Sequence, residues 1–337
     1  PKNAMQSGRA GTQRWMLEFA PSEARKADPL MGWAGSGDTQ RQLRLGFASQ
    51  EEAVATVKAA VDWGITFLDA APTYGDGKAE DVIGEAFGGR LPDGVRVSTK
   101  SRLGNPPSGE VLTRLRASLS DSLARMKLER VDFFFLHNMI VADEDQARYD
   151  GTPRTLFVDS VIPAFETLKE EGLIGAWGIT GIGVPDAILE TIEGSPPPQA
   201  IQVITNLLDS PGALKRFEGP AKPREIAAAA HRRGVGVMGI RAVQAGALTS
   251  EFDRQLPDDH PDTTDYRRAA AFRDLSRELG ESPAALAHRY ALSMNGVATV
   301  VLGVKNRAEL EECVEAEAKG RLAPEVMARI DGTAVRG

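Results

Sequence analysis

The chain has 337 residues, 42% of them hydrophobic and 26% charged, which is the composition of an ordinary globular protein. This composition excludes wholesale disorder and a fibrous repeat. The length fits two domains of about 150 residues each, or one large α/β barrel. A net charge of −7 argues against a nucleic-acid partner. The longest apolar run, 131–142, is too short to cross a bilayer, so we expect no membrane span.

The cysteine content and the first 50 residues bear on location and organisation. A single cysteine, Cys313, forms neither an internal disulfide nor a thiolate zinc site, so we expect a reducing, cytoplasmic location. Residues 1–50 carry seven basic and four acidic side chains, whereas the remainder of the chain is acidic overall. These residues also lack the regular alternation found later, which by itself indicates a solvated basic leader.

From residue 49 onward, helical and strand-like patterns alternate. Residues 49–52 (SQEE) form a capping box that opens a helix, and Gly64 ends this helix. Further helices are predicted near 79–87, 109–126, 159–171, 184–192, 222–233, 266–280, 283–293 and 306–318. Apolar strands are predicted near 65–68, 95–99, 131–136, 174–179, 200–204, 235–240 and 297–302. Strands that alternate with helices pair in parallel through right-handed crossovers.

Seven strands are one short of the closed barrel that such an alternation builds. We therefore predict an α/β fold, a (β/α)8 TIM barrel, with an atypical N-terminal segment in place of the usual first strand. The only candidate for this strand is the segment 29–33 (PLMGW). An open, doubly wound sheet is the alternative fold.

Ionisable side chains follow three consecutive strands of the predicted barrel. Asp69 follows the strand at 65–68, Lys100 follows the one at 95–99, and His137 follows the one at 131–136. Tyr74 lies five residues beyond Asp69 in the loop 70–75. Because parallel strands end at the same rim of a barrel, these four side chains converge if the barrel closes. A buried lysine is costly unless it is paired, and Asp69 is its natural partner.

This set of side chains suits proton transfer to an alkoxide. An unperturbed tyrosine has a pKa of about 10, and a neighbouring lysine cation lowers it by favouring the phenolate. The aspartate keeps Lys100 charged and in place, and His137 orients a carbonyl oxygen by donating a hydrogen bond. Because no side chain supplies hydride, the chemistry requires a nicotinamide cofactor. Each residue alone is more often structural than catalytic, so the prediction depends on their convergence.

The motifs around these residues resemble those of the aldo-keto reductase family. Residues 69–75 (DAAPTYG), with Glu80 and Gly84, resemble its signature, and 98–100 (STK) and 131–137 (VDFFFLH) resemble its next two blocks. Residues 172–180 (GLIGAWGIT), 201–202 (IQ), Asn206 and 300–313 resemble its cofactor-binding segments. The resemblance covers about residues 50–331. It implies a (β/α)8 barrel, NAD(P)H-dependent carbonyl reduction, and a catalytic tetrad of Asp69, Tyr74, Lys100 and His137, with Tyr74 as the general acid.

The resemblance also implies a set of cofactor-binding residues, with several departures from the family pattern. The implied residues are Thr180, Gln202, Ile240, Arg241, Gly246, Leu248, Gly303, Lys305, Arg307, Glu309, Glu312 and Cys313. Thr180-Gly181 replaces the usual Ser-Asn pair, Ile240 replaces an aromatic residue, and Cys313 replaces an asparagine. Glu309 stands where a basic or amide residue often contacts the 2′-phosphate, and Lys305 and Arg307 compensate for it. NADP is therefore favoured modestly, with NAD as the alternative.

Residues 1–50 resemble a different protein, the small accessory subunit of respiratory complex I. The resemblance rests on 2–9 (KNAMQSGR), 15–19 (WMLEF), 28–33 (DPLMGW) and 36–39 (SGDT). It implies two units, a complex-I-subunit-like segment at 1–50 and a reductase-like barrel at 51–337, and hence a fusion. The competing interpretation is a divergent reductase leader.

Two classes of function follow from these observations. The first is a cytoplasmic NAD(P)H-dependent reductase of aldehydes, ketones or sugars, acting on a small carbonyl or sugar substrate. The second is a cofactor-holding or accessory protein without useful turnover, linked to a respiratory complex through residues 1–50. No metal site is expected, because His231, His260 and His288 lack metal-ligand spacing and suit surface or capping roles.

Overall fold

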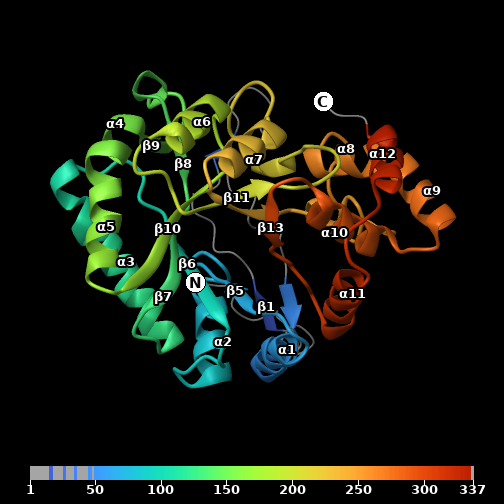
Figure 1. The fold of residues 1–337 in the computed structure, drawn as a ribbon, viewed down its shortest axis with the longest axis horizontal. Coiled ribbons are helices and arrows are strands. Elements are labelled where there is room, and N and C mark those ends of the chain that lie inside the picture. The colour runs from blue at the N-terminus through green and yellow to red at the C-terminus, as the bar shows by residue number, and fades with distance from the viewer. Residues whose placement is uncertain (1–14, 18–25, 28–33, 36–44, 48, 335–337) are drawn as a thin grey trace, which may run out of the picture.

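A computed structural model describes residues 15–17, 26–27, 34–35, 45–47 and 49–334, with side chains described from residue 49 (Figure 1). Its centre is a curled sheet of seven strands, all of them parallel to their neighbours. They are, in chain order, β5 (Phe67–Asp69), β6 (Arg96–Ser101), β7 (Val131–Leu136), β10 (Ile174–Thr180), β11 (Ala200–Ile204), β12 (Gly236–Ile240) and β13 (Val297–Val300). Each strand pairs with the next in this order, so the predicted barrel succession of seven strands is confirmed.

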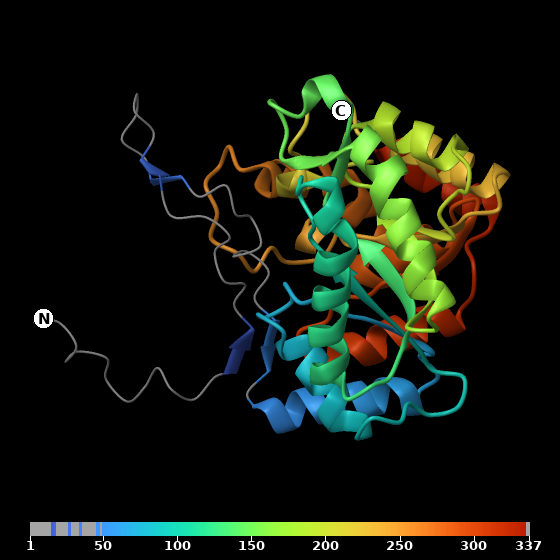
Figure 2. The ribbon, with the colours of Figure 1, turned by 90° about the vertical axis from the view of Figure 1, so that its left-hand side faces the viewer.

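Helices lie on the outside of the curled sheet (Figures 1 and 2). Those that precede the first strand of the sheet, connect successive strands or follow the last one are α1 (Gln50–Asp62), α2 (Lys78–Phe87), α3 (Val111–Met126), α5 (Ile162–Glu170), α6 (Pro185–Glu193), α7 (Pro223–Arg232), α10 (Pro283–Ser293) and α11 (Arg307–Ala318). The predicted helix at 266–280 is divided at Ala269 into α8 (Pro261–Arg268) and α9 (Ala270–Leu279). None of the described helices is long and apolar enough to cross a membrane.

Local sequence explains how the first described helix begins. The Ser49 hydroxyl accepts a hydrogen bond from the backbone N–H of Glu52 at 3.2 Å, which satisfies one of the unpaired donors of the first turn of α1. Ala53, Ala59 and Ala60 lie on its buried face. The capping box at 49–52 therefore begins the helix as its sequence predicts.

Aromatic side chains link strands to helices in part of the largely aliphatic core. Trp177 on β10 is fully buried and stacks on Phe165 of α5, with ring centroids 5.6 Å apart and planes 11° apart. Its indole N–H donates a hydrogen bond of 2.6 Å to Glu166, so the one polar atom of the ring is satisfied. Phe134 of β7 packs edge-on against Phe165. These contacts fix β10, the central strand, and its neighbour β7 against α5.

The two outer strands of the sheet, β5 and β13, do not pair with each other. An apolar cavity of about 480 Å³ lies between them, lined by side chains of β5, β13, α1, α2, α10 and α11. The segment 29–33, our candidate for the first barrel strand, lies outside the described residues. The described strands upstream of α1 form two small antiparallel pairs, β1 (Trp15–Leu17) with β4 (Leu45–Phe47) and β2 (Lys26–Ala27) with β3 (Ala34–Gly35). The β1–β4 pair lies next to α1 (Figures 1 and 2).

Several elements were not predicted. A parallel pair, β8 (Met139–Val141) with β9 (Gly151–Pro153), follows β7 and leads through α4 (Arg154–Leu156) to α5. A last helix, α12 (Pro324–Thr333), ends the described chain. The strand predicted at 65–68 is observed two residues later, as β5, and β6 extends to Ser101. Asp69 and Lys100 are therefore strand residues rather than the first residues after a strand.

Candidate active site

Asp69 and Lys100 form a buried ion pair at the carboxyl ends of neighbouring strands. Asp69 is the last residue of β5 and pairs in register with Ser98 of β6, so the Lys100 side chain reaches it from two residues further along. The distance from Lys100 Nζ to Asp69 Oδ2 is 2.7 Å, and Nζ also donates to the carbonyl oxygen of Ala70 at 2.8 Å. The side chain of Lys100 is fully buried and that of Asp69 is 5% exposed. Asp69 and Tyr74 raise the pKa of Lys100, against the opposing effect of burial, so Lys100 remains a cation.

Tyr74 lies directly beside this ion pair. Lys100 Nζ is 4.4 Å from the centre of its ring, and the Lys100 charge acts on its hydroxyl. Ala70 and Ala71, both fully buried, start the loop that carries Tyr74, and the backbone N–H of Tyr74 donates to the carbonyl of Ala71 at 3.0 Å. The small side chains at 70 and 71 allow this turn to pack into the rim, which brings Tyr74 back towards the strand ends.

The pKa of Tyr74 differs in direction from our sequence-based expectation. Burial raises the pKa of Tyr74 above its usual 10, and this effect outweighs the lowering by the Lys100 charge. The charge of Asp69 raises the pKa further. The expected lowering by lysine is therefore present but smaller than the cost of placing a phenolate in a low-dielectric environment. Tyr74 is thus protonated at neutral pH, which is the form that a general acid requires.

His137 is the next residue after β7, and its ring contacts that of Tyr74. Its backbone N–H donates to Ser101 at 2.8 Å, and its ring meets that of Tyr74 edge-on, with centroids 5.7 Å apart and planes at 85°. Its Nδ1 lies 3.4 Å from the hydroxyl oxygen of Thr73. Burial, followed by the charges of Lys100 and Arg102, lowers the pKa of His137 well below 6.5. The imidazole is therefore neutral, and suits hydrogen bonding rather than acid catalysis.

Two further donors fix the Asp69 carboxylate. Ser98 Oγ donates to Asp69 Oδ1 at 2.6 Å, and Gln202 Nε2 donates to the same oxygen at 2.9 Å. Sequence reasoning missed Ser98 and assigned Gln202 to the cofactor alone. The alternation of side chains along β6 was the available signal, because it places Ser98 and Lys100 on the same face of the strand.

A second buried carboxylate supports the strand that carries Lys100. Glu80 of α2 has a fully buried side chain, and it accepts hydrogen bonds from Thr99 at 2.5 Å and from Arg125 Nε at 2.6 Å. The Thr99 side chain lies on the opposite face of β6 from those of Ser98 and Lys100, because side chains alternate along a strand. Glu80 therefore ties α2 and α3 to β6 beneath the site, and its place in the signature motif has this structural reason.

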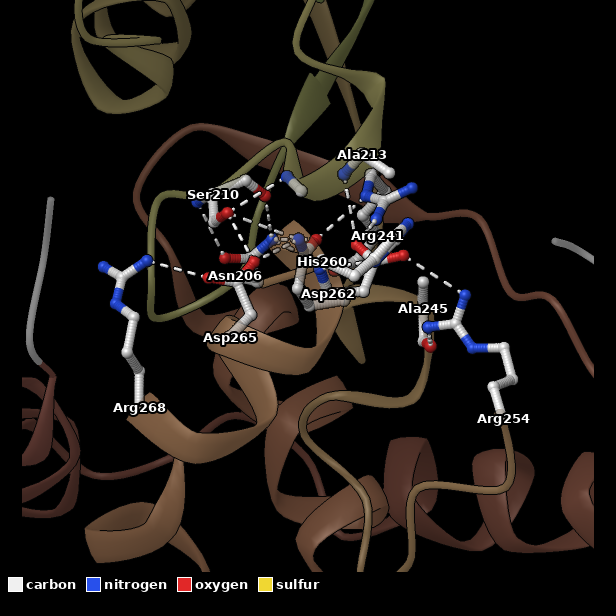
Figure 3. A network of polar contacts seen from close by, with 12 residues as sticks. Asn206, Ser210, Ala213, Arg241, Ala245, Arg254, His260, Asp262, Asp265 and Arg268 are labelled. Atoms are coloured by element: carbon white, nitrogen blue, oxygen red, sulfur yellow. Dashed lines mark hydrogen bonds and ion pairs between the residues drawn. The ribbon is translucent and has the colours of Figure 1, made fainter. Parts of the chain in front are cut away.

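The residues after β11 and β12 form a buried polar network at the same end of the sheet (Figure 3). Asp262 of α8, 2% exposed, contacts Arg241 at 3.4 Å and Arg254 at 3.2 Å. Arg241 has a φ of 58°, a backbone conformation that is strained for a residue with a side chain, and its Nε donates to Gln244 at 2.8 Å. His260 caps α8 by accepting from the N–H of Asp262, which agrees with the expected capping role.

The structure places the implied cofactor residues in three groups along the rim. The group on β10 and β11 adjoins the tetrad, since Gln202 contacts Asp69 and the Thr180 hydroxyl donates to the Leu136 carbonyl at 3.1 Å. In the group after β12, Ile240 is half-buried at the strand end, Gly246 ends a short helical turn (Gln244–Gly246), and Leu248 is fully buried in the core. Leu248 can therefore offer a cofactor only its backbone.

The third group follows β13. Gly303 is exposed, Arg307 lies over the ring of Trp63, and Glu312 accepts a hydrogen bond from Ser282. Lys305 is paired with Asp253 and, at 3.4 Å, with Glu309. Glu309 also accepts from the backbone N–H of Lys305 at 2.8 Å. The Lys305 cation is therefore shared between two carboxylates, and a phosphate would have to compete with them.

Cys313 is the last of the implied cofactor residues and lies on α11. Its side chain is buried and lines the apolar cavity between β5 and β13. Burial raises the pKa of the Cys313 thiol to about 12, so the sulfur is an uncharged thiol at neutral pH. Among the described residues there is no group of three or more His, Cys, Asp or Glu side chains that could hold a metal ion.

A parallel α/β barrel with Asp, Tyr, Lys and His side chains at the carboxyl rim defines a class of nicotinamide-dependent carbonyl oxidoreductase. The chain belongs to the aldo/keto reductase family, whose sequence model matches residues 31–334. The chain is 31% identical over 332 residues to a D-threo-aldose 1-dehydrogenase of a Pseudomonas species, with 88% of this chain and 92% of that one covered.

Solved structures of the family have the same fold. The holo form of an aldo-keto reductase from Bacillus halodurans matches with a TM-score of 0.65 and 23% identity, over 88% of this chain and 94% of that one. An aldo/keto reductase from Klebsiella pneumoniae in complex with NADP and acetate matches with a TM-score of 0.60 and 19% identity, over 86% and 87% of the two chains. The family match begins at residue 31, inside the segment that resembles a complex I subunit, and no comparison supports the expected fusion. We therefore do not propose one.

Proposed function

We propose that this protein interconverts a carbonyl and an alcohol by hydride transfer with a nicotinamide cofactor, and that Tyr74 is the general acid. The observation that carries this proposal is the position of the Lys100 ammonium, which is 2.7 Å from Asp69 Oδ2 and 4.4 Å from the centre of the Tyr74 ring. A phenol that touches a permanent buried cation can release its proton to a strong base and recover it afterwards.

In the reduction direction, the four side chains have separate roles. A bound reduced nicotinamide supplies hydride to the carbonyl carbon, and the developing alkoxide takes the proton of the Tyr74 hydroxyl. Lys100 stabilises the phenolate that remains, and Asp69 keeps Lys100 charged and directed at it. In the tautomer in which Nδ1 accepts from the Thr73 hydroxyl, neutral His137 carries its proton on Nε2, and this N–H donates to the carbonyl oxygen and orients it. In the oxidation direction, the Tyr74 phenolate takes the proton of the alcohol.

The rim residues fit the nicotinamide end of the cofactor well. Gln202 and Thr180 offer oxygen atoms beside the tetrad, as the carboxamide of a nicotinamide requires. At the other end, Lys305 and Arg307 are the cations for a 2′-phosphate. Because Asp253 and Glu309 already share Lys305, we infer that NADP is preferred over NAD only modestly.

We propose an aldose as the substrate class, on the strength of the relationship to D-threo-aldose 1-dehydrogenase. Oxidation at C1 of a cyclic aldose removes hydride from C1 and the proton of its hydroxyl group, and the product is a lactone. D-Threose and its C2 epimer D-erythrose make a matched pair of probes, because they differ only in the arrangement that the name of the relative specifies. A cytoplasmic location remains a prediction that the single buried thiol fits.

The test is to replace Tyr74 with Phe and measure two properties. We expect Tyr74→Phe to reduce turnover of D-threose or of 4-nitrobenzaldehyde by a factor of about 100 or more, because the proton donor is lost. Binding of NADPH and NADH, followed by quenching of tryptophan fluorescence, should be unchanged, because the phenol does not hold the cofactor. Full turnover in Tyr74→Phe would refute the acid assignment. Cofactor binding without turnover of any carbonyl by the wild type would instead favour the cofactor-holding alternative.

A further inference from the structure

Gln202 occupies a position between the ion pair and the expected nicotinamide site. It lies in the middle of β11, its side chain is 3% exposed, and its Nε2 donates to Asp69 Oδ1 at 2.9 Å. The carboxylate can only accept hydrogen bonds here, so the amide must face it with its NH2 group. Within the described part of the chain, the structure shows no donor to the other end of the amide, the Gln202 Oε1. Gln202 thus has one end in the tetrad and one end available.

The contact with Gln202 acts on a charge that Tyr74 senses. Asp69 raises the pKa of Tyr74 through its negative charge. Its carboxylate is held by Lys100 on Oδ2 and by Ser98 and Gln202 on Oδ1. A hydrogen bond to a carboxylate withdraws negative charge from it and stabilises the charged form. Without the Gln202 donor, the full charge of Asp69 would act on Lys100 and, beyond it, on Tyr74.

The carboxamide of a nicotinamide has the complementary group for the available end. Its NH2 group is a donor, and Gln202 Oε1 is an acceptor at the same rim. An amide that donates at one end and accepts at the other is polarised along its length, so a donor at Oε1 strengthens the hydrogen bond from Nε2. Binding at one end of Gln202 is therefore transmitted to Asp69 at the other.

We propose that Gln202 is a positioning residue that connects the carboxamide of the bound nicotinamide to the Asp69 carboxylate, so that cofactor binding prepares the Lys100–Tyr74 pair for proton transfer. This inference rests on the proposed function, because it takes Tyr74 as the proton donor. It goes beyond cofactor binding, since the role of Gln202 is assigned to its contact with Asp69. A residue that only held the carboxamide would affect cofactor affinity and leave the ionisation of Tyr74 unchanged.

The first test follows the ionisation of Tyr74 in the cofactor-free protein. Tyrosinate absorbance is titrated with pH, and the same titration of the matching Tyr74→Phe variant is subtracted, which removes the other three tyrosines. We expect Gln202→Leu to raise the Tyr74 midpoint by about 0.5–1 pH unit, because the Asp69 charge loses a donor. In an Asp69→Asn background the same replacement should produce no shift, because the charge is absent. Equal shifts in both backgrounds, or none in either, would overturn the proposal.

Gln199, next to the same strand as Gln202, provides the matched control. Its amide lies just before β11, at the opposite end, where it accepts from the N–H of Trp177 at 3.1 Å and donates to the Pro197 carbonyl. Gln199→Leu removes the same group from a position remote from Asp69. It should therefore lower stability without moving the Tyr74 midpoint. A shift as large as that of Gln202→Leu would show a structural effect and would contradict the assignment.

The second test examines the carboxamide end by binding alone. NADP+ is compared with its 3-acetylpyridine analogue, in which a methyl ketone replaces the carboxamide and removes its N–H donors. We expect the wild type to bind NADP+ about fivefold more tightly, which corresponds to one hydrogen bond, and Gln202→Leu to lose this preference. An unchanged preference in Gln202→Leu would refute the carboxamide contact.

The two proposals fail in different ways. If the wild type binds a cofactor but turns over no carbonyl, the proposed function fails, whereas both tests of Gln202 still give their results. If turnover requires Tyr74 but neither the midpoint nor the analogue preference responds to Gln202→Leu, only the role of Gln202 is refuted.

Discussion

Replacement of Lys100 by Met tests the buried ion pair, and the contacts of Asp69 determine the loss of folding free energy that we expect. The two side chains are of similar length, so the change removes the charge and leaves the volume. Lys100 is fully buried and its partner Asp69 is 5% exposed, so the variant strands a carboxylate away from water. Breaking a buried ion pair in this way costs about 3–5 kcal/mol of folding free energy. Ser98 and Gln202 still donate to Asp69, so we expect a loss near the lower limit, about 3 kcal/mol.

The assay is urea denaturation at neutral pH of four proteins: wild type, Lys100→Met, Asp69→Asn, and the double variant. The double variant lacks the stranded charge, so it should be about 2 kcal/mol more stable than Lys100→Met. Lys169→Met is the control, because Lys169 forms a partly exposed pair with Glu166 at 3.2 Å and its loss should cost about 0.5 kcal/mol or less. A loss below about 1 kcal/mol in Lys100→Met, with no recovery in the double variant, would refute the argument that the pair is buried and coupled.

Three further predictions concern groups outside the tetrad. Burial lowers the pKa of His288 to about 4, so that between pH 4 and 6.5 only the unfolded state is protonated at this residue, and the free energy of unfolding should fall by up to about 3 kcal/mol as the pH falls through this range. In urea titrations, His288→Gln should reduce this pH dependence of stability, and an unchanged pH dependence would contradict the burial of His288. Cys313, with a thiol pKa of about 12, should resist iodoacetamide at pH values near 8 in the folded protein and react once urea unfolds it; rapid native labelling, read by mass spectrometry, is the opposing result. Asp262→Asn should cost about 3–5 kcal/mol in thermal or urea unfolding, because Arg241 and Arg254 then face each other without a carboxylate, and a loss within about 0.5 kcal/mol would show that the network in Figure 3 adds little.

The succession of strands could be predicted from the sequence because each strand is a short apolar run bounded by helix signals. The parallel arrangement then follows from the crossovers, and it brings Asp69, Lys100 and His137 to one rim. The sequence pattern did not indicate strand pairing that depends on the conformation of a loop. The β8–β9 pair joins two short segments after β7 whose composition is mixed, and only the folded loop brings them together.

The fine structure of the site was beyond the sequence for a different reason. Gln202 and Asp69 are 133 residues apart, and nothing local indicates that the amide donates to this carboxylate. The direction of the pKa shift of Tyr74 depends on how deeply the phenol is buried, which is a property of the packing at the rim and not of residues adjacent in sequence. For the same reason, the pairing of Lys305 with Asp253, from a loop 52 residues away, was not anticipated.

Isotope transfer follows both parts of the proposed reaction, in which a nicotinamide supplies hydride to a carbonyl at this rim and Tyr74 supplies the proton. NADPH carrying deuterium at C4 is incubated with 4-nitrobenzaldehyde and the protein, and the alcohol is analysed by mass spectrometry. With the wild type we expect alcohol that carries one deuterium on the former carbonyl carbon, and with Tyr74→Phe we expect almost no alcohol at matched cofactor occupancy. The label is placed in turn at each of the two hydrogen positions of C4. Alcohol without deuterium from both labels, or equal amounts of deuterated alcohol from both proteins, would contradict this mechanism.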